Sequence, residues 1–241
     1  MTKAFEPLIR EPAYLKVFRA IEARIADGAL PDGAHLPTEA ELCEQFGVTR
    51  STVREGLRLL EQTGLVQRAG KKIVIKRPDS ADIAAAASKS FALGGVTFHE
   101  VWDALATLYP EAARLAAKRL SKDDIAALED TRAVLVAAPA DDHEATVAAA
   151  VEFFQLIARG LDNRVMLAML QSLNMMIGES LRQVIAGAPN ARARIANAQG
   201  ELVAAFRAHD ADRAADWMAK HIADLKRGYV VAKVDMNAAI L

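Results

Sequence analysis

The sequence predicts a mainly α-helical protein of two domains, residues 1–78 and residues 79–241. Three observations support this prediction. Apolar residues make up 52% of the 241 residues and recur mostly at helical spacing. Strand-like sequence is confined to one short stretch, LVQRAGKKIVI. The charge is also uneven, because residues 45–77 contain eight Lys and Arg but only two acidic residues.

The first domain is expected to begin with a helix over about residues 12–27, which the glycines and prolines of DGALPDGAHLP then end. A second helix follows at TEAELCEQF. Thr38 and Glu41 have the spacing of a capping box, in which each side chain binds the other residue's backbone N–H. Gly47 is expected to end this helix in a tight turn.

A third helix is predicted at RSTVREGLRLLEQT, with Thr49 as its N-terminal cap. After it, LVQRAGKKIVI reads as strand, glycine turn and strand, which is a small hairpin. Helix, helix, short turn, helix and hairpin in this order form a winged helix-turn-helix. Such a domain places the N-terminal end of its last helix in the DNA major groove, where arginine can pair with guanine or with phosphate.

The partner expected for this domain is double-stranded DNA. The residues expected to contact DNA lie at the start of the third helix and at the tip of the wing: Thr49, Arg50, Ser51, Thr52, Arg54, Gly70, Lys71 and Lys72. The alternative for any one of these residues is an ordinary solvated charge. The concentration of basic residues on a chain of net charge −1 favours a polyanion partner for this domain alone.

IADGALPDGAHLPTEAELCEQFGVTRSTVREGLRLLEQTGLV resembles the DNA-binding domain of the GntR family of bacterial transcription regulators. The resemblance covers about residues 12–77. It implies that the matching residues, Thr49 to Thr52 and Arg54, contact the operator, and that Gly70 is the wing glycine. Repression is the commoner mode of action in that family, so the resemblance implies a repressor that binds a palindromic operator as a homodimer.

The second domain is expected to be an all-α antiparallel bundle of six or seven helices. The predicted helices cover about residues 80–92, 97–119, 122–137, 142–160, 164–186, 191–208 and 210–230. Ser121 with Asp124 has capping-box spacing, and Asn163, Asn190 and Asp210 are each placed to cap the helix that follows.

YPEAARLAAKRLSKDDIAALE and AAFRAHDADRAADWMAKHI resemble the ligand-sensing FCD domain of the FadR-like branch of GntR regulators. Many members of this branch hold a divalent metal with one Asp and three His. The matching positions here are Ala150, Phe154, Gln199 and His221. Because one imidazole and one amide cannot hold a metal tightly, no metal and no cofactor are predicted.

A more apolar effector pocket is predicted in the same place, and an apolar or amphipathic ligand would suit it. Its expected lining is Tyr109, Phe154, Met166, Met175, Met176, Gln199, Trp217 and His221. The alternative is that these residues only fill the bundle core, because Met and aromatic residues at helical spacing often do so.

The sequence indicates a homodimeric, ligand-responsive regulator and no enzyme, because no catalytic motif such as Gly-x-Ser-x-Gly or a P-loop is present. The single cysteine, Cys43, and the lack of a secretory signal or of a long apolar run predict a cytoplasmic protein with no membrane segment. Two alternatives remain: a small-molecule-binding protein or enzyme with a vestigial winged domain, and a regulator whose bundle serves only dimerisation.

Overall fold

The structure, a computed structural model, describes residues 11–70, 72–139, 142–188 and 190–240. The chain divides into two compact units, and the boundary along the sequence falls between Asp79 and Ser80. Each unit is described by itself. Among the helices that the structure describes, none is long and apolar enough to cross a bilayer.

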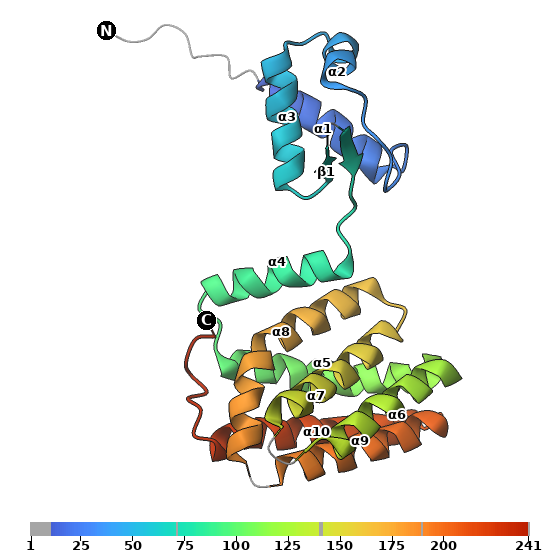
Figure 1. The fold of residues 1–241 in the computed structure, drawn as a ribbon, viewed down its shortest axis with the longest axis vertical. Helices are drawn as coiled ribbons and strands as arrows, with labels where there is room; N and C mark the ends of the chain where they lie inside the picture. Colours follow the sequence, from blue (N-terminus) through green and yellow to red (C-terminus); the bar gives the residue numbers. More distant parts are fainter. Residues whose placement is uncertain (1–10, 71, 140–141, 189, 241) are drawn as a thin grey trace, which may run out of the picture. The chain divides into compact units, whose positions relative to one another are not determined.

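The first unit contains three helices and a two-stranded antiparallel sheet, as the sequence predicts (Figure 1). The elements are α1 (Ala13–Ala26), α2 (Glu39–Phe46), α3 (Arg50–Gln62), β1 (Val66–Ala69) and β2 (Lys72–Ile75). Buried apolar side chains from every element form one core, with Val53, Leu57 and Leu60 of α3 completely enclosed. The amphipathic α3 is therefore held firmly by its inner face, which leaves its outer face available.

Local signals set the ends of these elements. The capping box of Thr38 and Glu41 is present, with the Thr38 backbone N–H donating to Glu41 at 2.7 Å. Gly47 ends α2 in the left-handed region, at a φ of 63°. The segment before α2 joins the hairpin, because the Leu36 N–H donates to the Ile73 carbonyl and the Ile75 N–H to the Ala34 carbonyl.

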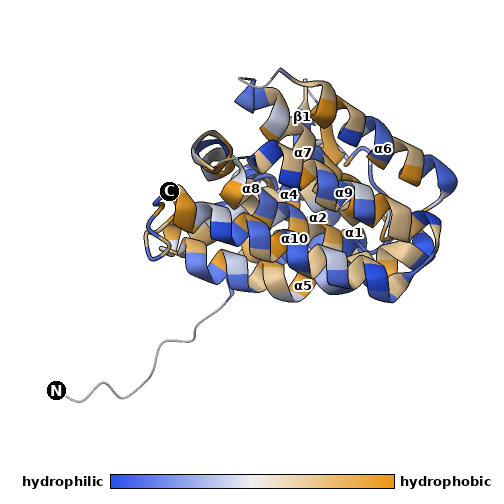
Figure 2. Cartoon of the chain, turned by 90° about the horizontal axis from the view of Figure 1, so that it is seen from below, coloured by the Kyte–Doolittle hydropathy of each residue, from blue (hydrophilic) through white to orange (hydrophobic). Residues whose placement is uncertain are grey.

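The second unit consists of seven helices among the residues described (Figure 1). They are α4 (Ser80–Leu93), α5 (Phe98–Arg119), α6 (Lys122–Ala137), α7 (His143–Arg159), α8 (Arg164–Gly187), α9 (Ala191–Arg207) and α10 (Ala211–Val231). The chief packing partners are α10 with α5 and α9, α4 with α8, and α6 with α7 and α9. Hydrophilic and hydrophobic residues alternate along these helices, as expected of amphipathic helices (Figure 2).

The predicted caps of the second unit are confirmed, with one exception. Ser121 and Asp124 form a capping box, and the side chains of Asn163 and Asp210 accept backbone N–H groups of α8 and α10. Asn190 was expected to cap α9 in the same way, but this prediction is wrong. Its backbone is left-handed, with a φ of 57°, and its side chain makes no capping hydrogen bond.

The segment after α10 packs against the start of α5. Thr97 and Ala239 form an isolated β-bridge. The His99 N–H donates to the Met236 carbonyl at 2.8 Å, and the Ile240 N–H donates to the Val96 carbonyl at 2.9 Å. This segment therefore supplies hydrogen-bond partners to the beginning of α5 that the helix itself cannot supply.

Candidate functional site

The first candidate site is the N-terminal end of α3. Thr49 caps the helix, because its hydroxyl accepts from the Thr52 N–H at 3.4 Å, and it lies 2.9 Å from the Ser51 hydroxyl. Arg50 and Ser51 are exposed, and Thr52 is partly exposed. The structure therefore brings hydroxyl groups and a guanidinium together at the positive end of a helix dipole, which favours anions.

Arg54 lies one turn further along the same exposed face and is held from the neighbouring helix. Its Nε donates to the Glu39 carboxylate of α2 at 2.8 Å, and this hydrogen bond raises the Arg54 pKa. This contact engages Nε, while the other four N–H donors of a guanidinium belong to its two terminal nitrogens. Arg58, another turn along, is also exposed and lies 3.9 Å from Glu55.

The wing is the turn between β1 and β2. Gly70 has a φ of 64°, a backbone conformation that residues other than glycine rarely adopt. In the strand register beside it, Ala69 lies opposite Lys72. Lys72 is exposed at this tip. Lys71, which was predicted beside it, lies outside the described residues. Arg68 is turned back toward α3, because its Nε lies 2.6 Å from Glu61 Oε1 in an ion pair.

Close packing against α1 fixes the position of α3. A Cβ placed on Gly56 would meet Val17 Cγ1 at 3.0 Å and the Tyr14 carbonyl oxygen at 3.1 Å. Gly56 therefore allows the two helices to approach more closely than any other residue would. This contact places the exposed face of α3 relative to the rest of the unit.

The second candidate site lies inside the bundle, where aromatic rings of three helices meet. The His221 imidazole of α10 stacks on the Phe154 ring of α7, with centroids 5.4 Å apart and an interplanar angle of 8°. Phe154 also contacts Tyr109 of α5, with the two ring centroids 4.7 Å apart. The Tyr109 hydroxyl in turn donates to Asn174 Oδ1 of α8 at 2.9 Å. One line of contacts therefore joins α10 to α8 through the interior.

Two polar side chains of this region are buried without partners. His221 Nε2 and both amide atoms of Gln199 have no hydrogen-bond partner among the described residues. Burial lowers the His221 pKa to about 4, and Asp224 opposes this shift only partly. Unpaired buried polar groups cost free energy, so they usually mark a bound water, a ligand or strain.

The structure corrects one member of the predicted pocket. Met175 is 55% exposed on α8, so it does not line an interior site. Its helix turns the neighbouring Asn174 and Met176 inward instead, at 4% and 5% exposure. Met166 packs against the edge of the core, and Trp217 is partly exposed.

The residues at the family's metal positions do not fit a metal ion. Ala150 and Phe154 supply no ligand atom, and the Phe154 ring covers one face of the His221 imidazole. Gln199 and His221 leave one amide and one neutral imidazole, which is too few donors. Within the described ranges, no group of three or more His, Cys, Asp or Glu side chains could hold a metal ion.

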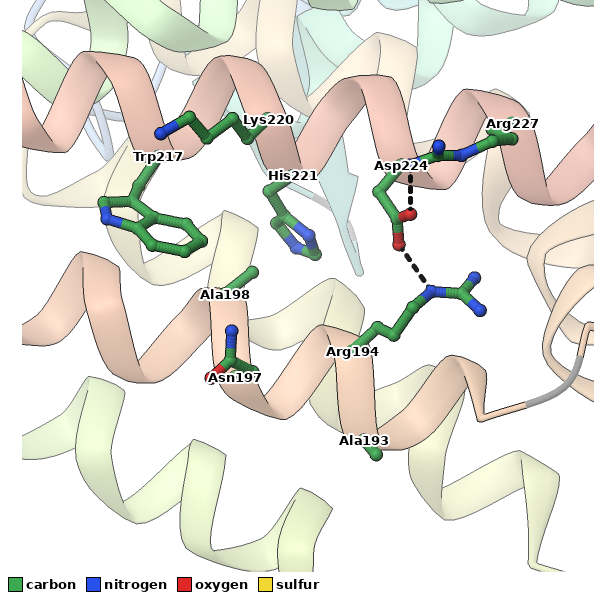
Figure 3. Close-up of a pocket in the computed structure, with 9 residues that line it drawn as sticks. All are labelled: Ala193, Arg194, Asn197, Ala198, Trp217, Lys220, His221, Asp224 and Arg227. Atoms are coloured by element: carbon green, nitrogen blue, oxygen red, sulfur yellow. Dashed lines mark hydrogen bonds and ion pairs between the residues drawn. The ribbon is translucent and has the colours of Figure 1, made fainter.

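A pocket of about 440 Å³ lies between α9 and α10, and His221 is part of its lining (Figure 3). Its lining comprises Ala193, Arg194, Asn197 and Ala198 of α9 and Trp217, Lys220, His221, Asp224 and Arg227 of α10. The sequence predicts Trp217 and His221 in a site but gives no reason to join them to the basic residues. The i, i+3 and i, i+4 spacing of Trp217, Lys220, His221 and Asp224 is the signal that would have placed them on one face.

Two further residues escaped the sequence prediction. Glu39 lies in the predicted second helix with no role assigned to it from the sequence, although it holds Arg54. Asn174 was not noted at all, although a polar residue in the apolar run LNMMIG is a signal of a buried hydrogen bond.

Two protein families match this chain. Residues 13–73 match the family described as bacterial regulatory proteins, gntR family, and residues 100–224 match the FCD domain. The solved structure of Streptococcus agalactiae GntR has the same fold, with a TM-score of 0.67 at 24% identity over 89% of this chain and 99% of that one.

Three curated relatives are similar over most of the chain. An uncharacterized HTH-type transcriptional regulator of Mycobacterium tuberculosis is 33% identical over 68% of this chain and 67% of its own length. The Glc operon transcriptional activator of Escherichia coli is 31% identical over 68% of this chain and 66% of its own length. The transcriptional repressor NanR of Edwardsiella tarda is 32% identical over 63% of this chain and 60% of its own length. About a third or more of each relative therefore lies outside the matched segment.

Proposed function

Because this chain belongs to the gntR family of bacterial regulatory proteins with an FCD domain, and is a DNA-binding transcription regulator and not an enzyme, we propose the following finer assignment. It is a ligand-responsive repressor that acts in the cytoplasm, where it binds a palindromic operator as a homodimer. The predicted first domain, residues 1–78, reads the DNA, and the predicted second domain, residues 79–241, dimerises and senses the effector.

The exposed N-terminal end of α3 carries this proposal. Arg50 and Arg54 are one turn apart on a helix whose opposite face is fully packed, so both guanidiniums can enter the major groove together. Ser51, Thr52 and the cap Thr49 add hydroxyl groups for phosphate oxygens. Lys72, with the neighbouring Gly70 and Lys71, would extend the contact to the backbone beside the groove.

The proposed dimer rests on the distribution of apolar surface. Six large apolar side chains that are exposed in the described chain belong to α4 and α8, which pack on each other: Ile83, Phe91, Leu93, Val165, Met169 and Met175. A second copy that covered them would bury apolar area, which is the chief favourable term in association. Two-fold symmetry of the protein would then match the palindrome.

The proposed effector site is the region of Tyr109, Phe154, Gln199, Trp217 and His221, which excludes the exposed Met175. Aromatic rings surround a few unpaired polar atoms here. Such a lining suits a rather apolar ligand that forms one or two hydrogen bonds, without a metal. A ligand shifts operator affinity only if it binds the two dimer arrangements differently.

The test begins by selecting high-affinity duplexes from a random DNA library with the wild-type protein. Fluorescence anisotropy then compares wild type with the Arg50→Ala, Arg54→Ala double variant. We expect the double variant to lose at least about a hundredfold in affinity, because each bidentate arginine contact is worth about 1–3 kcal/mol. The control, Arg19→Ala with Arg24→Ala, removes the same charge from α1 and should bind within about threefold of wild type.

Two results would contradict the proposal. If the double variant binds the selected duplex as tightly as wild type, α3 is not the reading helix. If the wild-type protein selects no duplex at all, the first unit is vestigial and the chain is a small-molecule-binding protein. The dimeric state is checked independently by sedimentation equilibrium with and without the duplex.

A further inference from the structure

The pocket between α9 and α10 has an aromatic wall and a basic rim. Trp217 and Ala198 form the apolar part, and the indole is partly exposed. Lys220 Nζ lies 4.9 Å from the centre of the Trp217 ring, where the π-face attracts a cation. Figure 3 shows both side chains on the same stretch of α10, with the indole extending toward α9 and Lys220 lying along α10 toward the indole. A volume of about 440 Å³ is within the range of small-molecule sites.

The charges around this pocket do not cancel. Arg194, Lys220 and Arg227 are basic, and Asp224 is the one acidic residue among the nine lining residues. Asp224 accepts from Arg194 Nε at 2.8 Å and from Arg227 Nη2 at 2.7 Å (Figure 3). Burial opposes ionisation of Asp224, but these two hydrogen bonds outweigh it and lower its pKa. One carboxylate therefore orders two guanidiniums, and the nine lining residues carry a formal charge of +2.

His221 forms the inner end of the same pocket. It is 2% exposed, and its Nε2 has no partner among the residues that the structure describes. In Figure 3 the imidazole points from α10 toward α9, between Trp217 and Asp224. The same ring stacks on Phe154, so a molecule that reaches His221 would also act on the ring contacts of the interior.

We propose that the α9–α10 pocket binds an amphipathic organic anion with a flat apolar body. Its anionic group would lie among Arg194, Lys220 and Arg227, its body on Trp217 and Ala198, and one polar atom against His221. The inference rests on the proposed function, because it identifies the ligand class and the binding position of the effector. It follows that the ligand is recognised by side-chain cations and an indole and needs no metal.

The experiment uses the full chain and two probes that differ in charge: 1-naphthylacetate and its neutral amide, 1-naphthylacetamide. Calorimetry without DNA measures the affinity of each. We expect the anion to bind about tenfold more tightly than the amide. Lys220→Gln with Arg227→Gln should weaken the anion about three- to tenfold and leave the amide unchanged, because exposed charge contacts are individually weak.

The matched control is Lys118→Gln with Lys226→Gln, which removes two positive charges from helices of the same unit outside the pocket. It should leave both affinities unchanged. The ¹⁵N resonance of His221 Nε2 should shift on adding the anion to the wild type. Equal affinities for the two probes, no binding at millimolar concentration, or an equal loss in the control would each overturn the proposed site.

Selected operator DNA is titrated with the same preparations in a separate experiment. Operator binding with no probe preference overturns the pocket proposal and leaves the DNA-binding function intact. Selective probe binding in a protein that binds no operator overturns the DNA-binding proposal and leaves the pocket proposal intact. The two proposals can therefore fail independently.

Discussion

Glu39 holds Arg54 by a 2.8 Å hydrogen bond between α2 and α3. Arg54 is 65% exposed at its side chain and Glu39 only 25%, so the carboxylate lies beneath the guanidinium. In solution such an exposed pair contributes little to stability. Its effect is to fix a long side chain in one orientation, and on the proposed DNA-binding face this orientation would decide which base Arg54 can read.

Glu39→Gln should therefore reduce the specificity of DNA binding more than its strength. We expect the ratio of affinities for the selected and a scrambled duplex to fall about three- to tenfold, partly because removing a negative charge strengthens non-specific binding. Anisotropy titrations on both duplexes measure this ratio. Glu55→Gln removes a negative charge from α3 without releasing Arg54. A similar fall in that variant would show that charge, and not orientation, is responsible.

Lys72→Gln at the wing should weaken binding to every duplex to a similar extent. A lysine that contacts phosphate carries no sequence information, and its loss reduces the slope of log affinity against log salt by about one. Titrations at several salt concentrations test both parts. A change confined to the selected duplex would indicate that the wing reads bases.

Gly56→Ala should destabilise the first unit, although alanine is the better helix former. The new methyl group would lie 3.0 Å from Val17 Cγ1 and 3.1 Å from the Tyr14 carbonyl oxygen. Overpacking of this kind costs about 1–3 kcal/mol, which exceeds the gain of about 1 kcal/mol in helix propensity. Amide hydrogen exchange in α3 should show reduced protection.

Gly178→Ala in α8 is the matched substitution, because nothing lies within 4 Å of the Cβ it would add. We expect it to raise the free energy of opening, as measured by amide hydrogen exchange in α8, by about 0.5–1 kcal/mol. If both variants stabilise their helices, the close approach of α1 and α3 is softer than the contacts at Gly56 indicate.

Acid should destabilise the second unit through His221. Its pKa is about 4 in the folded chain, against about 6.5 in an unfolded one. Between these values the unfolded chain binds a proton that the folded chain does not, so stability falls as the pH falls from 6.5 to 4. The free energy of unfolding should therefore fall by about 2 kcal/mol between pH 7 and pH 5.

Urea denaturation at the two pH values measures this loss, and His221→Gln should remove most of it. His99→Gln replaces an exposed histidine on α5 and should retain the wild-type dependence. An identical pH dependence in the His221 variant would mean that other groups govern the response to acid.

Most of the architecture follows from local sequence signals. Helix ends are set by short-range chemistry, so the capping boxes at Thr38 and Ser121 can be read directly. Asn190 shows the limit of such reading. Asparagine can adopt a left-handed backbone conformation, and its side chain can also cap a helix. In this protein Asn190 has the left-handed backbone and does not cap α9.

The sites are less predictable because they depend on contacts between distant residues. Helical spacing alone cannot tell which way α8 is rotated, so the sequence predicts both Met175 and Met176 in the interior, whereas the structure exposes Met175 and buries Asn174 beside Met176. The pairing of Glu39 with Arg54 and the stacking of Phe154 on His221 need the tertiary fold. The residues predicted to contact DNA can nevertheless be proposed from the sequence, because the cap, the arginine spacing and the turn lie within one short segment.

The β-bridge between Thr97 and Ala239 has a consequence for how the protein is made. The beginning of α5 receives the Met236 and Ala238 carbonyls from the far end of the same unit. A ribosome delivers those residues after every helix that the structure describes in the bundle. The first unit can complete its core while synthesis continues, whereas the bundle is closed only after residues 236–240 leave the exit tunnel.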